Sequence, residues 1–284
     1  MATLEFQEQF GPWALITGAS SGLGQSFARK LAAKGLNVVL TSRSEKKLRA
    51  LAEELQDDYG VETRVIAIDL CQRDSVDALY IRCADLKIGL VVSNAGAAQM
   101  LNFMNYSLDA IRESTQLNVN THIDIARYFG KSILDRGEGR GGLLFMSSII
   151  GFQGAPYLSI YGASKSHILS FAEALHYENR NKGLHVTAVA AGPVKTPMMH
   201  MNKLAKKVIR RSKLTVLDPS RVTDGALDAL QKNTPVYIPG ILMRWQFGFI
   251  RRYFNTRSMG VKYWGKAIKR YMKIYINIAA QSSD

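Results

Sequence analysis

A tyrosine and a lysine one helical turn apart are the residues of this chain best suited to acid–base chemistry. Tyr161 and Lys165 begin and end the segment Tyr-Gly-Ala-Ser-Lys, and on a helix this spacing points both side chains to the same side. A phenol with a pKa of about 10 is a poor acid–base catalyst at neutral pH. A lysine ammonium close by favours the phenolate and lowers that pKa. The pair therefore predicts an acid–base site, although the same spacing also occurs in ordinary surface pairs.

A glycine-rich turn follows the first apolar run of the chain. It reads Thr-Gly-Ala-Ser-Ser-Gly-Leu-Gly over residues 17–24, between an expected strand at 13–17 and an expected helix at 23–33. Glycines there let backbone N–H groups approach a pyrophosphate at the helix N-terminus. The turn predicts a dinucleotide site, with an ordinary strand–helix turn as the alternative. The residues expected to contact the cofactor are Gly18, Ser20, Ser21, Gly22, Leu23 and Gly24.

The end of the second expected strand, at 37–41, discriminates between the two nicotinamide cofactors. An NAD enzyme usually has an acidic residue there, which holds the ribose 2′-OH. This chain has Ser42 instead, followed by Arg43, so no carboxylate repels a 2′-phosphate and a guanidinium can pair with it. The pattern favours NADP(H) over NAD(H). The alternative is that Arg43 is a solvated loop cation.

The rest of the chain up to about residue 240 alternates short apolar runs with helical patterns. This alternation indicates a parallel sheet covered by helices on both faces, which is an α/β fold. Strands are expected at 13–17, 37–41, 64–68, 90–93, 143–147, 184–190 and 236–238. Helices are expected at 23–33, 45–59, 74–83, 108–135, 159–181 and 219–230.

The motifs, taken together and in this order, resemble the short-chain dehydrogenase/reductase family over about residues 12–240. The glycine turn resembles the family's T-G-x-x-x-G-x-G, and Tyr161 to Lys165 resembles its Y-x-x-x-K. Asp69 and Leu70 match the family's adenine-contacting position. The turn Asn94-Ala95-Gly96 matches the last three residues of the family's N-N-A-G motif, whose first asparagine is replaced by Ser93. The last match is the segment with Pro193, Val194 and Thr196. The resemblance implies one doubly wound Rossmann domain with a parallel sheet of about seven strands.

The resemblance also implies a catalytic set and a reaction. Ser148 lies thirteen residues before Tyr161, as in the family, and would bind the substrate oxygen; Ser147 is the adjacent alternative. Asn120 would hold a water that links the lysine to solvent, with Asn118 as its competitor. Tyr161 would donate a proton to the developing alkoxide while a hydride passes between the nicotinamide and a carbonyl carbon. Lys165 would also bind the nicotinamide ribose. The 193–196 segment would bind the carboxamide of the nicotinamide. Family members commonly form homodimers or homotetramers through the helices at 108–135 and 159–181.

Composition excludes several other classes of protein. The 284 residues are 47% apolar and 21% charged, which is typical of a globular protein. No apolar run approaches the roughly 20 residues that cross a bilayer, and the N-terminal residues show no signal-peptide pattern. Two cysteines form no disulfide framework, which suggests a reducing, cytoplasmic setting. The five histidines show no metal-ligand spacing, so no metal is expected.

The net charge of +14 is confined to the last third of the chain. Residues 1–194 hold 19 Lys+Arg and 19 Asp+Glu, whereas residues 195–284 hold 18 Lys+Arg and four acids. We expect a catalytic domain at 1–240, with a substrate lid at 195–216, and a basic, aromatic, helical extension at 241–284. A basic amphipathic helix rich in Trp and Tyr indicates peripheral binding to an anionic membrane. Packing on the protein is the alternative, and nucleic acid is unlikely on this fold.

The expected function follows from the catalytic motifs and the composition of the tail. The tail resembles that of a lipid- and steroid-type branch of the family, and methionines in the lid could line a hydrophobic pocket or simply pack it down. The expected substrate is therefore a hydrophobic carbonyl compound such as a 3-oxoacyl thioester, a steroid or another lipid ketone. The alternative is a sensor that keeps the fold for dinucleotide binding only; Ser148, Tyr161 and Lys165 together argue against it.

Overall fold

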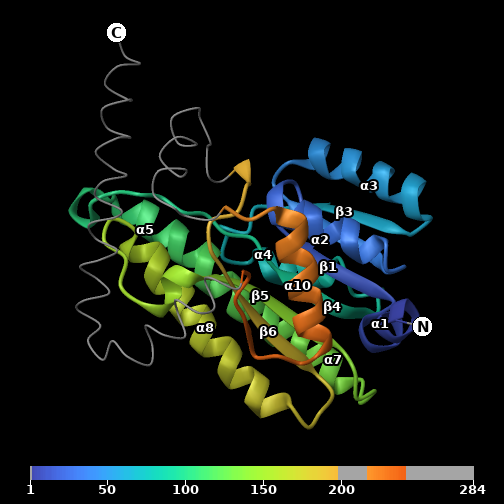
Figure 1. The fold of residues 1–284 in the computed structure, drawn as a ribbon. Helices are drawn as coiled ribbons and strands as arrows, with labels where there is room; N and C mark the ends of the chain where they lie inside the picture. Colours follow the sequence, from blue (N-terminus) through green and yellow to red (C-terminus); the bar gives the residue numbers. More distant parts are fainter. Residues whose placement is uncertain (1, 198–215, 241–284) are drawn as a thin grey trace.

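A computed structural model of the chain describes residues 2–197 and 216–240. Its centre is a seven-stranded sheet in the order β3-β2-β1-β4-β5-β6-β7 with all neighbours parallel (Figure 1). The strands are β1 Trp13–Thr17, β2 Asn37–Ser42, β3 Thr63–Ala67, β4 Ile88–Ser93, β5 Gly142–Ser148, β6 His185–Ala191 and β7 Val236–Tyr237. The predicted doubly wound α/β fold is confirmed.

The strand order reverses between β1 and β4, which are neighbours although two other strands separate them in sequence. In a parallel sheet the loops that leave the carboxyl ends of the two strands at such a point diverge, and the crevice between them is where doubly wound proteins bind ligands. The glycine-rich turn leaves β1 here and the Asn94–Gly96 turn leaves β4. The fold therefore brings the two predicted cofactor motifs together at the carboxyl ends of neighbouring strands.

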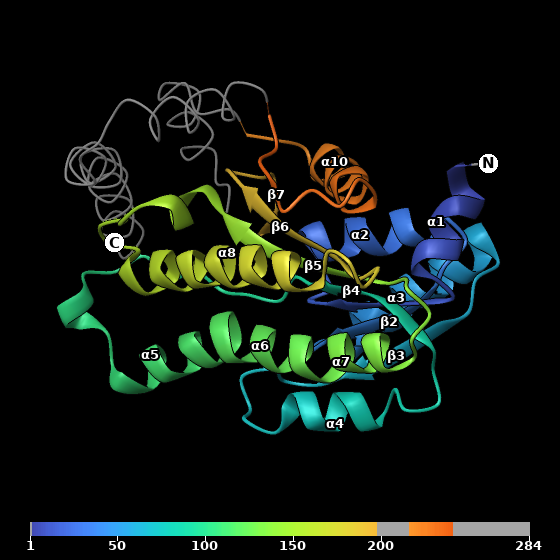
Figure 2. The same cartoon turned by 90° about the horizontal axis from the view of Figure 1, so that it is seen from below.

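Helices cover both faces of the sheet (Figures 1 and 2). One face carries α1 Ala2–Phe10, α2 Gly22–Ala32, α3 Glu45–Tyr59 and α10 Pro219–Gln231. The other face carries α4 Ser75–Ile81, a long helical segment over 108–135 and α8 Ser159–Asn179. Each layer buries its own apolar cluster against the strands, because alternate strand residues point to opposite faces. Most predicted boundaries agree with these to within two residues.

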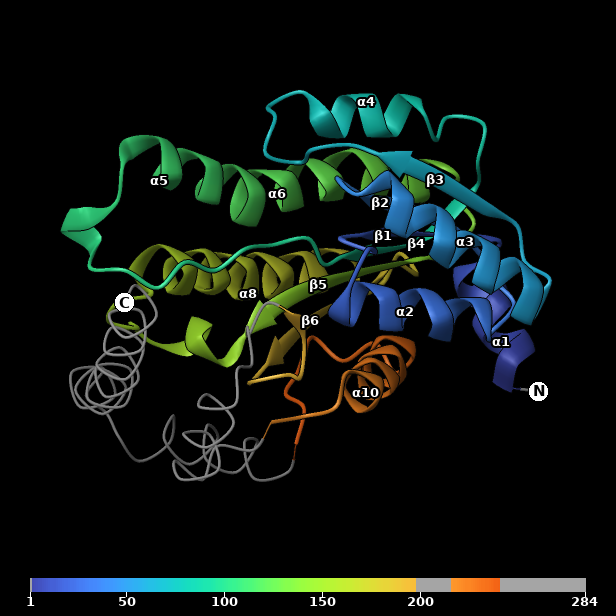
Figure 3. The ribbon, with the colours of Figure 1, turned by 90° about the horizontal axis from the view of Figure 1, so that it is seen from above.

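The helical segment over 108–135 has the predicted limits but not a regular interior. It consists of α5 Leu108–Thr115, the π-helical turn η2 Gln116–Asn120, α6 Thr121–Ile125, a second π-helical turn η3 Ala126–Gly130 and α7 Lys131–Asp135. A π-turn inserts residues into the helix and changes which side chains face inward, and such turns are frequent at functional sites. The first of them carries both candidate asparagines. The segment runs beside α8 (Figure 3).

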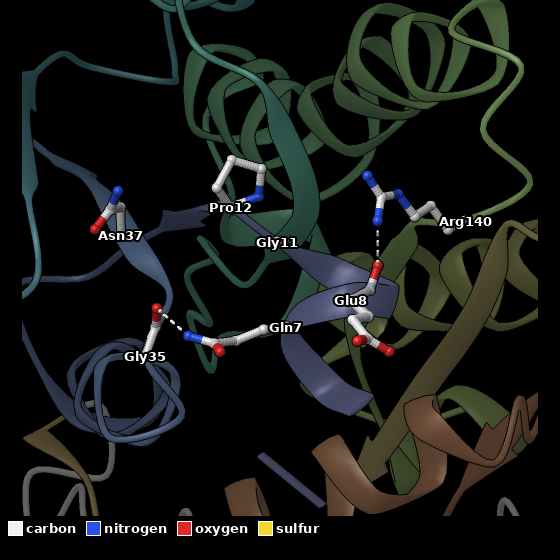
Figure 4. Close-up of a pocket in the computed structure, with 7 residues that line it drawn as sticks. All are labelled: Gln7, Glu8, Gly11, Pro12, Gly35, Asn37 and Arg140. Carbon is white, nitrogen blue, oxygen red and sulfur yellow. Dashed lines mark hydrogen bonds between the residues drawn. The ribbon is translucent and has the colours of Figure 1, made fainter. Parts of the chain in front are cut away.

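The sequence analysis missed α1, whose signal was the pair Phe6 and Phe10 one turn apart. Both rings are fully buried, with their centroids 4.7 Å from each other. A surface hollow lies beside this helix, and its lining includes Gln7, Pro12 and Arg140 (Figure 4). Because Pro12 precedes β1, the hollow lies at the amino ends of the strands. It is therefore at the opposite end of the strands from the predicted cofactor motifs.

Two predicted features fall mainly on other parts of the chain. The lid at 195–216 lies almost entirely outside the described residues, and the extension at 241–284 lies wholly outside them. Within 2–197 and 216–240, no helix is long and apolar enough to cross a membrane, and no group of three or more His, Cys, Asp or Glu side chains is placed to hold a metal ion.

Candidate active site

Tyr161 and Lys165 lie on the first turns of α8, and Ser148 ends the neighbouring strand β5. The Lys165 Nζ lies 5.6 Å from the centroid of the Tyr161 ring. The Ser148 hydroxyl donates to the Ala191 carbonyl oxygen at 3.2 Å and accepts from the Ile150 N–H at 3.3 Å, and it also interacts with the Tyr161 phenol. The structure thus brings together the three residues predicted to form the catalytic centre.

Lys165 is a buried cation, with only 3% of the residue exposed. Its Nζ donates a hydrogen bond of 2.8 Å to the Met146 carbonyl oxygen. Burial lowers the pKa of the Lys165 ammonium to about 8, because the charged form loses its hydration. A lysine that remains protonated at neutral pH without an acidic partner is costly to bury, which indicates a functional role for its charge.

The two candidate serines have different surroundings. Ser147 is also buried, but its hydroxyl donates to the Lys165 backbone carbonyl at 2.7 Å. That bond ties α8 to β5 and commits the hydroxyl proton to the backbone. Ser148 faces Tyr161 instead. The geometry therefore favours Ser148 over Ser147 as the residue that binds a substrate oxygen.

The Tyr161 phenol differs from what the sequence predicts in one respect. Burial raises the pKa of Tyr161 to about 12, and the contact with Ser148 offsets part of that increase. The predicted decrease required the Lys165 ammonium to stabilise the phenolate, but in the protein alone that ammonium is hydrogen-bonded to Met146 and is itself partly neutralised by burial. The phenol is therefore protonated at neutral pH, which is the state of a proton donor.

The two candidate asparagines lie on opposite sides of the helical segment. Asn120 is exposed, and its amide donates to the Gln116 side chain at 2.9 Å. Asn118 is fully buried; its amide accepts from the Ala97 N–H at 3.0 Å and donates to the Ala97 carbonyl oxygen at 2.9 Å. The expectation for Asn120 is thus not supported by the structure, which places its competitor Asn118 at the site. The reason is that positions two apart on a helix point to opposite sides.

Asn118 also lies close to Lys165. A Cβ atom added to Gly96 would lie 2.9 Å from the Asn118 Oδ1 and 3.5 Å from the Lys165 Nζ. The two polar groups therefore converge on the turn that follows β4. Only glycine fits at this position without displacing one of them.

The glycine-rich turn has the close backbone approaches that its sequence predicts. Gly18 and Gly22 have φ angles of 68° and 57°, in the left-handed region that favours glycine. A Cβ atom on Gly24 would lie 2.2 Å from the Gly18 carbonyl oxygen, so α2 begins in direct contact with the turn. Ser21, with extended backbone, forms the N-cap of α2 but makes no side-chain capping bond, and the first N–H groups of the helix are free for an anion.

The Asn94–Gly96 turn is fixed to the end of β1. The Thr17 hydroxyl accepts hydrogen bonds of 2.9 Å from both the Asn94 and the Ala95 N–H groups. The Asn94 amide in turn donates to the Thr17 carbonyl oxygen at 2.8 Å. Thr17 was not singled out in the sequence analysis, although its place immediately before the first glycine was a usable signal.

The residues expected to hold the adenosine half lie at the ends of β2 and β3. Arg43 is exposed and makes no hydrogen bond or ion pair with any other described residue, whereas the Ser42 hydroxyl accepts from the Ser44 N–H. Asp69 caps its own turn by accepting from the Cys71 N–H, and Leu70 is buried. The Thr121 hydroxyl, which sequence reasoning missed, donates to the Leu70 carbonyl oxygen at 3.0 Å.

The segment after β6 closes over the glycine-rich turn. Val194 pairs with Leu217 in a parallel bridge, and the Thr196 hydroxyl donates to the Val194 carbonyl oxygen at 3.4 Å. A Cβ atom on Gly22 would lie 3.0 Å from the Thr196 methyl carbon. Thr196 thus lies against the glycine-rich turn, and the role of Pro193, Val194 and Thr196 at the nicotinamide end remains what the resemblance implies.

These residues fit a dinucleotide on the grounds of their own geometry. The turn beside Gly18 and Gly24 leaves room for no side chain, and the helix behind it presents uncapped N–H groups. At the end of β2 stands the Arg43 guanidinium, which pairs with no other residue in the described part of the chain. Backbone donors at a helix N-terminus suit a pyrophosphate, and Arg43 suits a further phosphate.

Comparison with known proteins shows the family to which the chain belongs. Residues 12–207 match the family model of the short chain dehydrogenases. The chain is 33% identical over 243 residues to a very-long-chain 3-oxoacyl-CoA reductase of Macaca fascicularis, covering 83% of this chain and 74% of that protein. The chain belongs to the short-chain dehydrogenase family, and it is an oxidoreductase of the kind that binds a nicotinamide dinucleotide.

Two solved structures show the same architecture. A 7beta-hydroxysteroid dehydrogenase structure superposes with a TM-score of 0.83 at 26% identity, covering 92% of this chain and 99% of that one. A short-chain dehydrogenase from Sphingobium yanoikuyae, solved in complex with NADPH, superposes with a TM-score of 0.74 at 29% identity, covering 85% of this chain and 94% of that one.

Proposed function

We propose that this protein is an NADP(H)-dependent oxidoreductase that interconverts a carbonyl group and an alcohol on a hydrophobic substrate. The observation that carries the proposal is the convergence of Tyr161, Ser148 and the buried Lys165 at the carboxyl ends of the strands, beside the glycine-rich turn. The cofactor supplies or accepts the hydride. In the reductive direction Tyr161 donates its proton to the developing alkoxide, Ser148 binds the same oxygen, and the Lys165 charge favours the phenolate that remains.

The proposed substrate class rests on the apolar surroundings of the phenol. Met100, Ile150 and Tyr157 pack with Tyr161 around the buried Ala155 and Leu158. These apolar side chains would contact an acyl chain or a steroid ring more favourably than a sugar. Its chemistry agrees with the substrates in the names of similar proteins, a 3-oxoacyl-CoA reductase and a 7beta-hydroxysteroid dehydrogenase.

A direct assay tests the proposal. We expect the purified protein to oxidise NADPH, followed by its absorbance, in the presence of 3-oxoacyl thioesters or steroid ketones and not of sugar ketones. A protein that binds NADPH tightly but turns over no ketone or alcohol would instead support the dinucleotide-binding sensor.

The choice of cofactor gives a prediction at Arg43. The exposed, unpaired guanidinium at the end of β2 is proposed to pair with the 2′-phosphate, and a hydrogen bond to a charged group contributes about 1.5–3 kcal/mol. We expect Arg43→Ala to raise the dissociation constant of NADPH by about 10- to 100-fold and that of NADH by less than about threefold. Arg73→Ala serves as a control on another exposed loop cation. Equal losses for both cofactors would show that Arg43 does not bind the 2′-phosphate.

The buried lysine gives a prediction about pH. The pKa of Lys165 is lowered to about 8, so its charge is present below that pH and is lost above it, while Tyr161, with a pKa raised to about 12, stays protonated. We expect kcat/KM for ketone reduction to be flat near neutral pH and to fall above about pH 8. In Lys165→Arg, whose side chain does not deprotonate, this fall should disappear from any residual activity. A flat profile of the unchanged protein up to about pH 10 would contradict the role of the lysine charge.

The basic extension at 241–284 gives a proposal about location. It holds nine Lys+Arg up to residue 278, no acid over that range, and many aromatic residues, and each basic residue near an anionic membrane contributes about 1 kcal/mol. We propose that the protein is cytoplasmic and lies at a membrane surface. It should sediment with anionic liposomes at low salt, and a variant ending at Gly240 should not, while still reducing a water-soluble short-chain ketone. Failure of the full-length protein to sediment would favour packing of the extension on the protein.

A further proposal concerns assembly. The helical segment over 108–135 and α8 lie side by side on the outer surface of one layer (Figure 2). Tyr128 and Tyr177 are among the exposed large apolar side chains of these two elements. A two-fold dimer, or a tetramer built from it, would cover this surface.

A further inference from the structure

A buried serine–histidine pair lies beneath the active site and has no part in the chemistry described so far. Ser93, at the end of β4, and His122, on α6, are 1% and 0% exposed, and the Ser93 Oγ lies 2.6 Å from the His122 Nδ1. The imidazole packs edge-on against Phe145, with centroids 6.4 Å apart. Its Nε2 is buried and makes no hydrogen bond of ordinary geometry with the described residues, although the Ala95 backbone lies close enough to favour the protonated ring and so act against the lowering of its pKa by burial. A polar group buried at this cost requires an explanation.

The position of the Ser93–His122 pair suggests what it does, because the pair lies at the start of the Asn94–Gly96 turn. On the β1 side, Thr17 binds the Asn94 and Ala95 N–H groups. On the opposite side two side chains of the long helical segment hold the chain at either end of the turn: Asn118 binds both backbone groups of Ala97, just after the turn, and His122 binds Ser93, just before it. The turn is thus held at both ends by the helix as well as by β1.

The position of this turn fixes the surroundings of the Lys165 ammonium. Gly96 lies so close that an added Cβ atom would be 3.5 Å from the Lys165 Nζ. A displacement of the turn by about 1 Å would therefore change the packing over the ammonium and the room left for a bound cofactor. Misplacement of groups on this scale is costly to catalysis.

We propose that Ser93 and His122 form a positioning pair that holds the Asn94–Gly96 turn over Lys165, and so sets both cofactor affinity and the placement of the catalytic lysine. The proposal rests on the proposed function for the role of Lys165. The imidazole stays neutral at neutral pH: burial, and then the nearby Lys165 charge on α8, lower the pKa of His122 to about 3, although the Ala95 backbone acts to raise it. A neutral ring adds no second positive charge beneath the lysine.

The test uses variants of the full chain, each assayed well below its melting temperature. Ser93→Ala removes one oxygen atom, and His122→Phe removes the ring nitrogens while keeping an aromatic ring. We expect each to raise the NADPH dissociation constant about tenfold and to lower kcat about tenfold, as the loss of one buried hydrogen bond implies. The double variant should be no worse than the worse single one, because both changes break the same bond. Ser93→Thr, which keeps the hydroxyl, should stay within about threefold of the unchanged protein.

A matched control separates positioning from folding. His176 also binds a strand atom through its Nδ1, 3.0 Å from the Val186 carbonyl oxygen, but at the far end of α8. His176→Phe should lower the melting temperature without changing kcat or the NADPH dissociation constant. The proposal is overturned if Ser93→Ala and His122→Phe lower only the melting temperature, or if their effects on NADPH binding add. If no ketone is turned over at all, the proposed function fails, while the NADPH dissociation constants still decide on the pair.

Discussion

Replacement of Tyr161 by phenylalanine is expected to lower kcat for ketone reduction by about a thousandfold or more while changing the dissociation constant of NADPH by less than about threefold. The phenol contacts Ser148, and its ring centroid lies 5.6 Å from the Lys165 Nζ; loss of a positioned acid–base group reduces rates by about 10²–10⁴-fold. A thousandfold loss corresponds to about 4 kcal/mol of transition-state stabilisation. The ring itself remains, so its apolar packing against Ala155 and Leu158 should be kept.

The control for this change is a second phenol in the same apolar cluster. Tyr157 packs in the same cluster as Tyr161, four residues earlier in the chain. Tyr157→Phe removes a hydroxyl group of the same kind and should leave kcat within about threefold of the unchanged enzyme. Measuring both variants by single-turnover NADPH oxidation separates chemistry from product release. If Tyr161→Phe kept most of its kcat, the acid would have to be sought elsewhere.

The fold could be predicted from sequence because a parallel sheet leaves a strong pattern. Strands buried on both faces, such as β4 with every residue buried, appear as continuous apolar runs, and their alternation with amphipathic helices leaves few topologies. The glycine-rich turn was equally predictable, since Gly18 and Gly24 are required by backbone conformation and close approach that no other residue allows.

Several features of the structure could not be predicted, because they depend on which way a helix faces and on which groups are buried. α1 was missed because its large apolar residues are few and do not all face the core: Phe6 and Phe10 are buried, whereas Leu4 is exposed. The pKa of Tyr161 was expected to fall, but the sequence does not show that the Lys165 Nζ binds the Met146 carbonyl oxygen or that the phenol is desolvated. The Ser93–His122 bond joins residues 29 apart on two elements, and no local pattern predicts it.

The choice between Asn118 and Asn120 shows the same limit, and it provides a prediction with its own control. Sequence spacing favoured Asn120, yet the π-turn η2 directs Asn118 inward, where its amide makes two bonds to the backbone of Ala97 and a third, of 3.1 Å, to the Ser114 hydroxyl. Leucine is close to asparagine in shape but can make none of these bonds. Asn118→Leu would therefore leave buried donors and acceptors unpaired beside Lys165, and loosen the chain that follows Gly96.

We expect Asn118→Leu to lower kcat by about a hundredfold, because it removes a polar group beside the lysine and misplaces the turn above it. Asn120→Leu, made two residues away on the exposed side of the same π-turn, loses only a surface bond to Gln116 and should stay within about twofold of the unchanged enzyme. Circular dichroism and the melting temperature establish that both variants fold. The reverse result, with Asn120→Leu inactive and Asn118→Leu active, would restore Asn120 as the residue that links Lys165 to solvent, and would mean that the helix turns differently when substrate and cofactor are bound.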